Sequence, residues 1–259
     1  MAWFMGIDIG SGTSKGVITE DKKILAYHLI PSGFNYKAGA KKLREELLAK
    51  INLSPEDIAR TVATGQGAGS IPFSGEQVSD IRCCARGVNS IFPSVRTVID
   101  VQGQSTQVIR LDEVGKVTNF VVSEKCAAGS GRFLDIVANV LRIELKDAGP
   151  LSLKSNNPVA FTTGCAVFGE SEAISRVSEG FSKEDILAGV HRALANKISA
   201  LIASVGLEEE CAITGGGGLN IGLIKSVEEK LGVQLRVPPH PQFVTALGAA
   251  IMAEESSTG

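Results

Sequence analysis

The sequence predicts a mixed α/β fold, because it alternates apolar strands, amphipathic helices and glycine-rich turns. The opening run FMGIDIG at 4–10 is a strand that the turn GSGTSKG ends, and the residues up to 30 indicate a hairpin around an Asp-Lys turn. Apolar residues then recur at helical spacing over 43–51. SPEDI at 54–58 predicts the start of another helix, with Ser54 as its cap.

The middle of the chain repeats this opening pattern. After a predicted short strand at 61–65, the segment VRTVIDVQGQSTQVIRL at 95–111 again gives an apolar strand, an aspartate, a glycine-containing turn and a second strand. Asp8 and Asp100 end the corresponding strands, 92 residues apart. A chance match is the alternative, but the repeat predicts two domains on related plans.

The remaining elements alternate helix and strand. One apolar helical face covers 133–141, and a longer one covers 187–205 behind a Ser182 cap. A strand at 211–214 runs into four glycines, and the helix at 242–254 is expected to fold back onto the first domain. The expected domains are therefore residues 1–95 plus 243–259, and residues 96–242.

Composition excludes several classes of protein. The chain is 44% hydrophobic with a net charge of −2 and has no block of Lys or Arg, so we expect no nucleic-acid partner. The start lacks a basic leader, and no run of about 18 apolar residues occurs, so we expect neither a signal peptide nor a membrane span. A cytoplasmic protein is the expectation.

Two of the five cysteines stand in unusual positions. Cys126 lies in KCAAGSGRF and Cys165 in TTGCAVFGESE, each ahead of a helix-like segment. A helix start favours thiolate, because its dipole and free N–H groups stabilise negative charge. For Cys83, Cys84 and Cys211 we expect buried core thiols instead.

Three glycine-rich turns follow three predicted strands, and each could offer backbone N–H groups to an anion. GSGTSKG at 10–16 lacks the order of a P-loop, and GQGAGS at 65–70 does not fit the dinucleotide pattern. The chain has two predicted strands that end in an aspartate and a polar hairpin, and a later strand that ends in glycines. This order of elements resembles the layout of actin-like ATPases. That superfamily includes sugar kinases and the 70-kilodalton heat-shock chaperones.

The motifs GIDIGSGTSK, TVIDVQGQ, SEKCAAGSGRFLD, CAVFGESE and TGGGGLN, with ALGAA near the end, narrow the match. Together they resemble the ATP-dependent activators of 2-hydroxyacyl-CoA dehydratases and the ATPase subunits of benzoyl-CoA reductase, over nearly the whole chain. The resemblance implies an α/β, actin-like (ribonuclease H-like) fold of two related lobes with a nucleotide cleft between them. It also implies a homodimer that holds one [4Fe-4S] cluster through Cys126 and Cys165 of both subunits.

The same resemblance implies where ATP and magnesium bind. Asp8 would hold Mg through water, and Gln104 would orient the attacking water. The other residues that would contact the nucleotide are Ser11, Gly12, Thr13, Lys15, Gly103, Gly215, Gly216 and Gly217. Each has a simpler alternative: Asp8 as a turn cap, Lys15 as a solvated charge and the glycine run as a flexible turn.

The chain departs from the family in its second phosphate loop. Relatives usually read Asp-Ile-Gly-Gly-Gln-Asp where this chain has DVQGQS at 100–105, so Ser105 replaces a carboxylate. Glu170 or Glu172 could fill that role instead. Cys84 also stands where relatives often have His, and GQGAGS replaces a Gly-Tyr-Gly-Arg segment, which indicates a divergent branch.

The expected function is ATP-dependent delivery of a low-potential electron to a partner iron–sulfur enzyme, with ferredoxin or flavodoxin as donor. The acceptor would be a 2-hydroxyacyl-CoA dehydratase or a related reductase, such as a double-cubane cluster protein. A small-molecule kinase is the alternative enzyme, although it needs a base aspartate near Ser105. A nucleotide-binding regulatory module is the non-enzymatic alternative, and only the activator requires iron.

Overall fold

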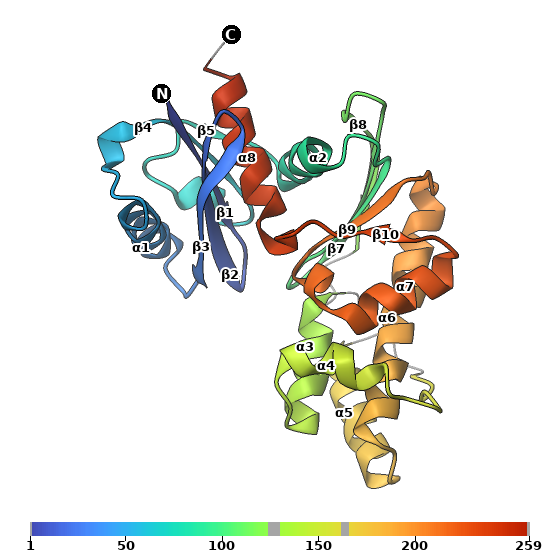
Figure 1. Cartoon of the computed structure of the whole chain (residues 1–259). Helices are drawn as coiled ribbons and strands as arrows, with labels where there is room; N and C mark the ends of the chain where they lie inside the picture. The colour runs from blue at the N-terminus through green and yellow to red at the C-terminus, as the bar shows by residue number, and fades with distance from the viewer. Residues whose placement is uncertain (1, 124–129, 162–165, 258–259) are drawn as a thin grey trace. The chain divides into compact units, whose positions relative to one another are not determined.

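The computed structural model describes residues 2–123, 130–161 and 166–257, with the side chains of 166 and 167 left aside. Its contacts divide the chain into two compact units. The first contains Met1–Val95, Leu111–Val117 and Gln242–Gly259, and the second contains Arg96–Arg110 and Thr118–Pro241. Each unit is built on a five-stranded mixed sheet (Figure 1).

The sheet of the first unit has the order β3-β2-β1-β4-β5. Its strands are β1 (Trp3–Ile9), β2 (Thr13–Glu20), β3 (Lys23–Pro31), β4 (Ile58–Thr64) and β5 (Glu76–Gln77). β1 pairs antiparallel with β2 and parallel with β4. The predicted Asp-Lys turn between β2 and β3 is confirmed: Asp21 and Lys22 take φ values of 49° and 61°, as a tight hairpin turn requires.

Helices cover both faces of this sheet (Figure 1): α1 (Tyr36–Ala49), α2 (Asp80–Ile91) and α8 (Val244–Glu255). Alternate residues of β1 point to opposite faces. Met5 and Ile7 share a core with Leu43 and Leu47 of α1, while Phe4 packs with residues of α2 and α8. At Gly6 the backbone of α8 comes so close that a Cβ would overlap the carbonyl of Ala246.

The helix predicted from SPEDI is wrong in length. Ser54 and Asp57 do form the capping box, with Ser54 N–H donating to Asp57 Oδ2 at 2.7 Å, but they cap only one 3-10 turn, Pro55–Asp57. The chain then enters β4, because IARTVAT carries β-branched residues and pairs with β1. A second 3-10 turn, Ala68–Ser70, follows that strand.

The sheet of the second unit has the order β10-β9-β6-β7-β8. Its strands are β6 (Thr97–Val101), β7 (Thr106–Leu111), β8 (Val117–Val122), β9 (Cys211–Gly215) and β10 (Leu235–Arg236). β6 pairs antiparallel with β7 and parallel with β9. Aligning β6 with β1 gives both sheets the same order, which confirms the prediction of two related lobes.

Helices of the second unit are α3 (Gly131–Leu141), α4 (Leu145–Ser152), α5 (Ala166–Ser178), α6 (Lys183–Val205) and α7 (Ile221–Leu231). Two 3-10 turns, Gly216–Leu219 and Pro241–Phe243, follow β9 and β10. Ser182 caps α6 as predicted, with its hydroxyl accepting from Asp185 N–H at 3.1 Å. α6 is long and apolar enough to cross a membrane, but its buried side chains belong to the core of the second unit.

Candidate functional site

Asp8 and Lys15 form an ion pair in the first unit. They are register partners on β1 and β2, and Lys15 Nζ lies 3.1 Å from Asp8 Oδ2. Burial raises the pKa of the Asp8 carboxyl; Lys15 lowers it, and the nearby charge of Asp80 adds to the rise. A carboxylate at this position suits a hydrated magnesium ion, and an ammonium group beside it suits phosphate.

The turn at 10–13 contains the residues predicted for phosphate binding: Ser11, Gly12 and Thr13. Ser32 fixes this turn, because its N–H donates to the Gly12 carbonyl at 3.1 Å and its hydroxyl donates to the Gly10 carbonyl at 2.6 Å. The buried Ser14 hydroxyl lies 2.8 Å from that of Ser32. Among the described residues, nothing accepts from the N–H groups of Ser11 and Gly12. A rigid turn with free donors fits an anion.

Gly65 completes this group at the end of β4. It has φ +84°, and a Cβ there would overlap Asp8 Oδ1 and lie 2.7 Å from the Ile9 carbonyl oxygen. Only glycine takes this φ without strain and leaves room for the carboxylate.

The second unit repeats this arrangement around Asp100. Asp100 pairs with Thr214 of β9, as Asp8 pairs with Thr64 of β4. Gly215 follows with φ +74°, and a Cβ on it would lie 2.6 Å from Asp100 Oδ1. The two units therefore share one local geometry, in which a glycine with positive φ lies against the second-last residue, an aspartate, of the neighbouring strand.

The loop after Asp100 carries the predicted Gly103 and Gln104, and both are exposed. Gln102 Nε2 donates to Asp100 Oδ2 at 2.7 Å, and Ser105 Oγ donates to Gln102 Oε1 at 3.3 Å. The family resemblance implies glycine and aspartate at these two positions, whereas in this chain the neutral side chains of Gln102 and Ser105 are hydrogen-bonded in series to Asp100.

The three predicted glycines after β9 differ in surroundings. A Cβ on Gly215 or Gly217 would meet this chain itself, at Asp100 and Val101, whereas one on Gly216 would meet nothing within 4 Å. Gly215 and Gly217 are thus required by the fold of the second unit, and Gly216 leaves its backbone open.

The cysteines divide as the sequence predicts where the structure describes them. Cys83, Cys84 and Cys211 are buried thiols that form no disulfide with one another. Burial raises the pKa of Cys83 and of Cys211 to about 12, so neither forms a thiolate readily. Cys126 and Cys165 lie outside the described residues. Within 2–123, 130–161 and 166–257, no cluster of three His, Cys, Asp or Glu could hold a metal ion.

Glu170 and Glu172, the alternative carboxylates, both lie on α5. Glu170 is exposed, while Glu172 lies 3.5 Å from Arg176 Nη2.

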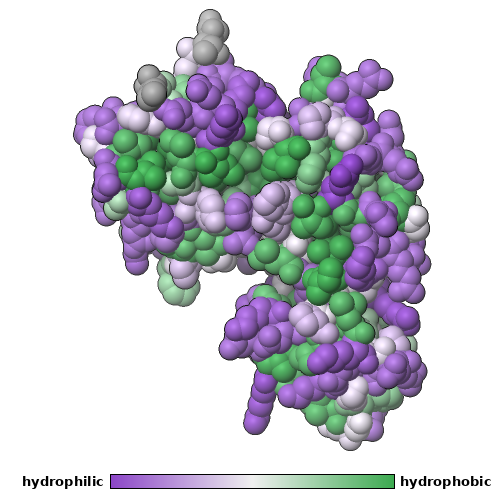
Figure 2. All heavy atoms as spheres, viewed as in Figure 1, coloured by the Kyte–Doolittle hydropathy of each residue, from purple (hydrophilic) through white to green (hydrophobic). Residues whose placement is uncertain are grey.

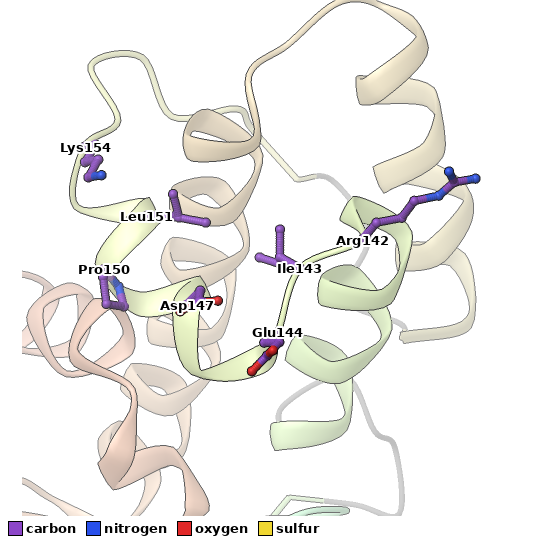
Figure 3. Close-up of a pocket in the computed structure, with 7 residues that line it drawn as sticks. All are labelled: Arg142, Ile143, Glu144, Asp147, Pro150, Leu151 and Lys154. Atoms are coloured by element: carbon purple, nitrogen blue, oxygen red, sulfur yellow. The ribbon is translucent and has the colours of Figure 1, made fainter.

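A hollow of about 530 Å³ lies between the end of α3 and α4 (Figure 3). Its lining residues are Arg142, Ile143, Glu144, Asp147, Pro150, Leu151 and Lys154. Arg142 points away from the others in Figure 3, and Glu144 pairs with Lys146 at 2.6 Å. This hollow contains none of the residues predicted from the sequence.

Sequence reasoning missed Ser32, Gly65 and the bridging role of Gln102. Ser32 is distant in sequence from the turn it fixes and belongs to no motif. Gly65 had a detectable signal, because Thr64-Gly65-Gln66-Gly67 matches Thr214-Gly215-Gly216-Gly217.

Comparisons with known proteins identify the family of the chain. The model of the BadF/BadG/BcrA/BcrD ATPase family matches residues 5–253. The 2-hydroxyisocaproyl-CoA dehydratase activator of Clostridioides difficile is 40% identical over 96% of this chain and 94% of its own. The (R)-2-hydroxyglutaryl-CoA dehydratase activating ATPase of Acidaminococcus fermentans is 41% identical over 96% of both chains.

Solved structures show the same fold. The structure of the Clostridium difficile activator with bound ADPNP has a TM-score of 0.95 at 39% identity, covering 99% of this chain and 96% of that one. A ROK family glucokinase from Streptomyces griseus matches with a TM-score of 0.60 at 13% identity, covering 98% of this chain and all of that one, which shows the fold alone. The chain therefore has the actin-like ATPase fold and belongs to the BadF/BadG/BcrA/BcrD ATPase family.

Proposed function

We propose that this protein is an ATP-dependent activator that passes a low-potential electron to a partner iron–sulfur enzyme. The observation that carries the proposal is similarity over 96% of the chain to two proteins named as dehydratase activators. The Asp8–Lys15 pair and the fixed turn beside it support ATP as the energy source.

In this proposal each residue of the nucleotide site has a separate role. Asp8 holds magnesium through water, and Lys15 with Ser11, Gly12 and Thr13 contacts the phosphates. Gly103 would also contact the phosphates, and the exposed amide of Gln104 would orient the attacking water. The open backbone at Gly216, flanked by Gly215 and Gly217, allows close approach of the nucleotide.

Cys126 and Cys165 of two subunits would hold a [4Fe-4S] cluster, since four thiolates suit this cluster and the other three cysteines are buried. Such a cluster supplies one-electron chemistry at low potential. Large apolar side chains on α5, just after Cys165, are exposed: Phe168, Ile174 and Val177. Hydrophobic atoms also lie at the surface of the second unit in Figure 2. These side chains support burial of α5 in a homodimer.

The proposed electron donor is ferredoxin or flavodoxin, and the proposed location is the cytoplasm. The acceptor is a 2-hydroxyacyl-CoA dehydratase or a related reductase. The replacements at Gln102 and Ser105 favour a divergent branch, whose acceptor differs from those of the named relatives.

The test is the fate of the γ-phosphate. The anaerobically purified protein is given Mg-ATP alone, or with glucose, N-acetylglucosamine or pantothenate. An activator releases inorganic phosphate at a rate that these compounds do not change. Transfer of phosphate to any of them would establish a kinase and contradict the proposal.

A further inference from the structure

Gln102 joins two parts of the second unit through its side chain and its backbone. The side chain donates to Asp100 Oδ2 at 2.7 Å, and Asp100 is only 1% exposed. The Gln102 carbonyl accepts from Gly131 N–H at 2.9 Å, and the next carbonyl, of Gly103, accepts from Arg132 N–H at 2.9 Å.

Gly131 and Arg132 are the first residues of α3. The first N–H groups of a helix have no partner within the helix, so acceptors outside the helix stabilise its first turn. Here the acceptors are carbonyls of the loop that leaves Asp100. The approach is close, since a Cβ on Gly131 would lie 3.3 Å from the Gln102 carbonyl oxygen.

The loop is also closed on itself. Gln102 N–H donates to the Ser105 carbonyl at 2.9 Å, and Ser105 Oγ donates to Gln102 Oε1 at 3.3 Å. A change of partner by the Gln102 amide would therefore also affect its bond with Ser105, in the loop whose carbonyls accept from the first residues of α3.

We propose that Gln102 is a positioning residue that couples the Asp100 carboxylate to the first turn of α3. This inference rests on the proposed function, because it needs nucleotide and magnesium to act on Asp100. Binding of nucleotide and magnesium at Asp100 then moves the Gln102 amide and the loop that carries it. The movement of the loop shifts the first turn of α3, which begins five residues after Cys126 in sequence.

Amide hydrogen exchange tests the coupling. The N–H groups of Gly131 and Arg132 are followed with and without Mg-ADPNP, in wild type, in Gln102→Met and in the control Gln234→Met. Methionine keeps the length of glutamine but not its amide, and Gln234 is exposed in the same unit. Nucleotide should change exchange at both amides about fivefold or more in wild type and control. In Gln102→Met the change should disappear while the protein still binds Mg-ADPNP.

Equal nucleotide responses in wild type and Gln102→Met would overturn the coupling, as would a wild type that binds Mg-ADPNP without any response at these amides. Failure of wild type to bind Mg-ADPNP would instead overturn the proposed function and the coupling with it. If Gln102→Met does not fold, Ser105→Ala replaces it, because it removes the bond that orients the Gln102 amide. Its response should then be smaller than that of wild type, and an undiminished response would overturn the coupling.

Discussion

Gly65 lies against Asp8 so closely that a Cβ on residue 65 would overlap the carboxylate oxygen Oδ1. Gly215 lies against Asp100 in the same way in the second unit. Each aspartate is thus the second-last residue of its strand, and beside it lies a glycine with positive φ at the end of the neighbouring strand. Each carboxylate has room only because the residue beside it is a glycine without a Cβ.

Gly65→Ala should lower the free energy of unfolding by more than the cost of placing an alanine at a positive φ. The left-handed conformation alone costs an L-residue about 1–2 kcal/mol, and the overlap with Asp8 should add about 1–3 kcal/mol. Gly180→Ala is the matched control, because Gly180 has φ +85° and a Cβ there meets nothing within 4 Å. Urea unfolding measures both; equal losses of unfolding free energy would mean that residue 65 tolerates a Cβ.

Asp8→Asn should lower Mg-dependent ATP hydrolysis about 100-fold or more, because the neutral amide no longer holds the hydrated cation. Asp147→Asn is the control, since Asp147 is exposed on α4. Phosphate release is measured at equal iron content. Hydrolysis at the wild-type rate in Asp8→Asn would remove Asp8 from the site.

Ser105→Asp should raise basal ATP hydrolysis, since it introduces the carboxylate that the family resemblance implies at this position. A positioned polar group typically raises the rate of a reaction ~10²–10⁴-fold, so we expect the rate of hydrolysis to rise at least about tenfold. Ser105→Asn is the matched control, with the same shape and no charge. If both variants hydrolyse ATP at the wild-type rate, the departure at this position is silent.

His191 should make the stability depend on pH. It is fully buried in α6, and burial lowers the pKa of its imidazole from 6.5 to about 4. Among the described residues neither ring nitrogen has a hydrogen-bond partner. As the pH falls from 6.5 to 4, the unfolded chain takes up a proton that the folded chain resists. The free energy of unfolding should therefore fall by up to ~1.4 kcal/mol per pH unit in this range.

His191→Leu should remove this contribution, while His240→Gln, at an exposed histidine, should keep it. Urea unfolding of all three proteins at pH 7 and pH 5 gives the comparison. A pH dependence in His191→Leu as large as that of wild type would assign it to other groups.

Local patterns predicted most of the fold because each rests on a few neighbouring residues. The Asp21-Lys22 turn and the Ser182 cap are of this kind. SPEDI shows the limit, since its capping box is real but the length of the turn is decided by the pairing of β4 with β1. A capping motif predicts where a helix starts, but it does not predict whether the residues that follow pair with a distant strand instead.

The site shows the same limit. Asp8 and Lys15 could be paired from the sequence because a short hairpin puts them opposite each other. Ser32 and Gly65 could not be placed, because their contacts with the 10–13 turn and with Asp8 depend on how distant strands align. The burial of Cys83, Cys84 and Cys211 was expected because a cysteine without a special role usually packs as a small apolar residue.

Iron and acid-labile sulfide content, measured on the anaerobically purified protein, tests the central claim most directly. A [4Fe-4S] cluster shared by two chains gives about two irons and two sulfides per chain. We expect this content in wild type and in the control Cys211→Ala, and its loss in Cys126→Ala and in Cys165→Ala. Iron-free wild type, or full iron and sulfide in either Cys126→Ala or Cys165→Ala, would contradict the account.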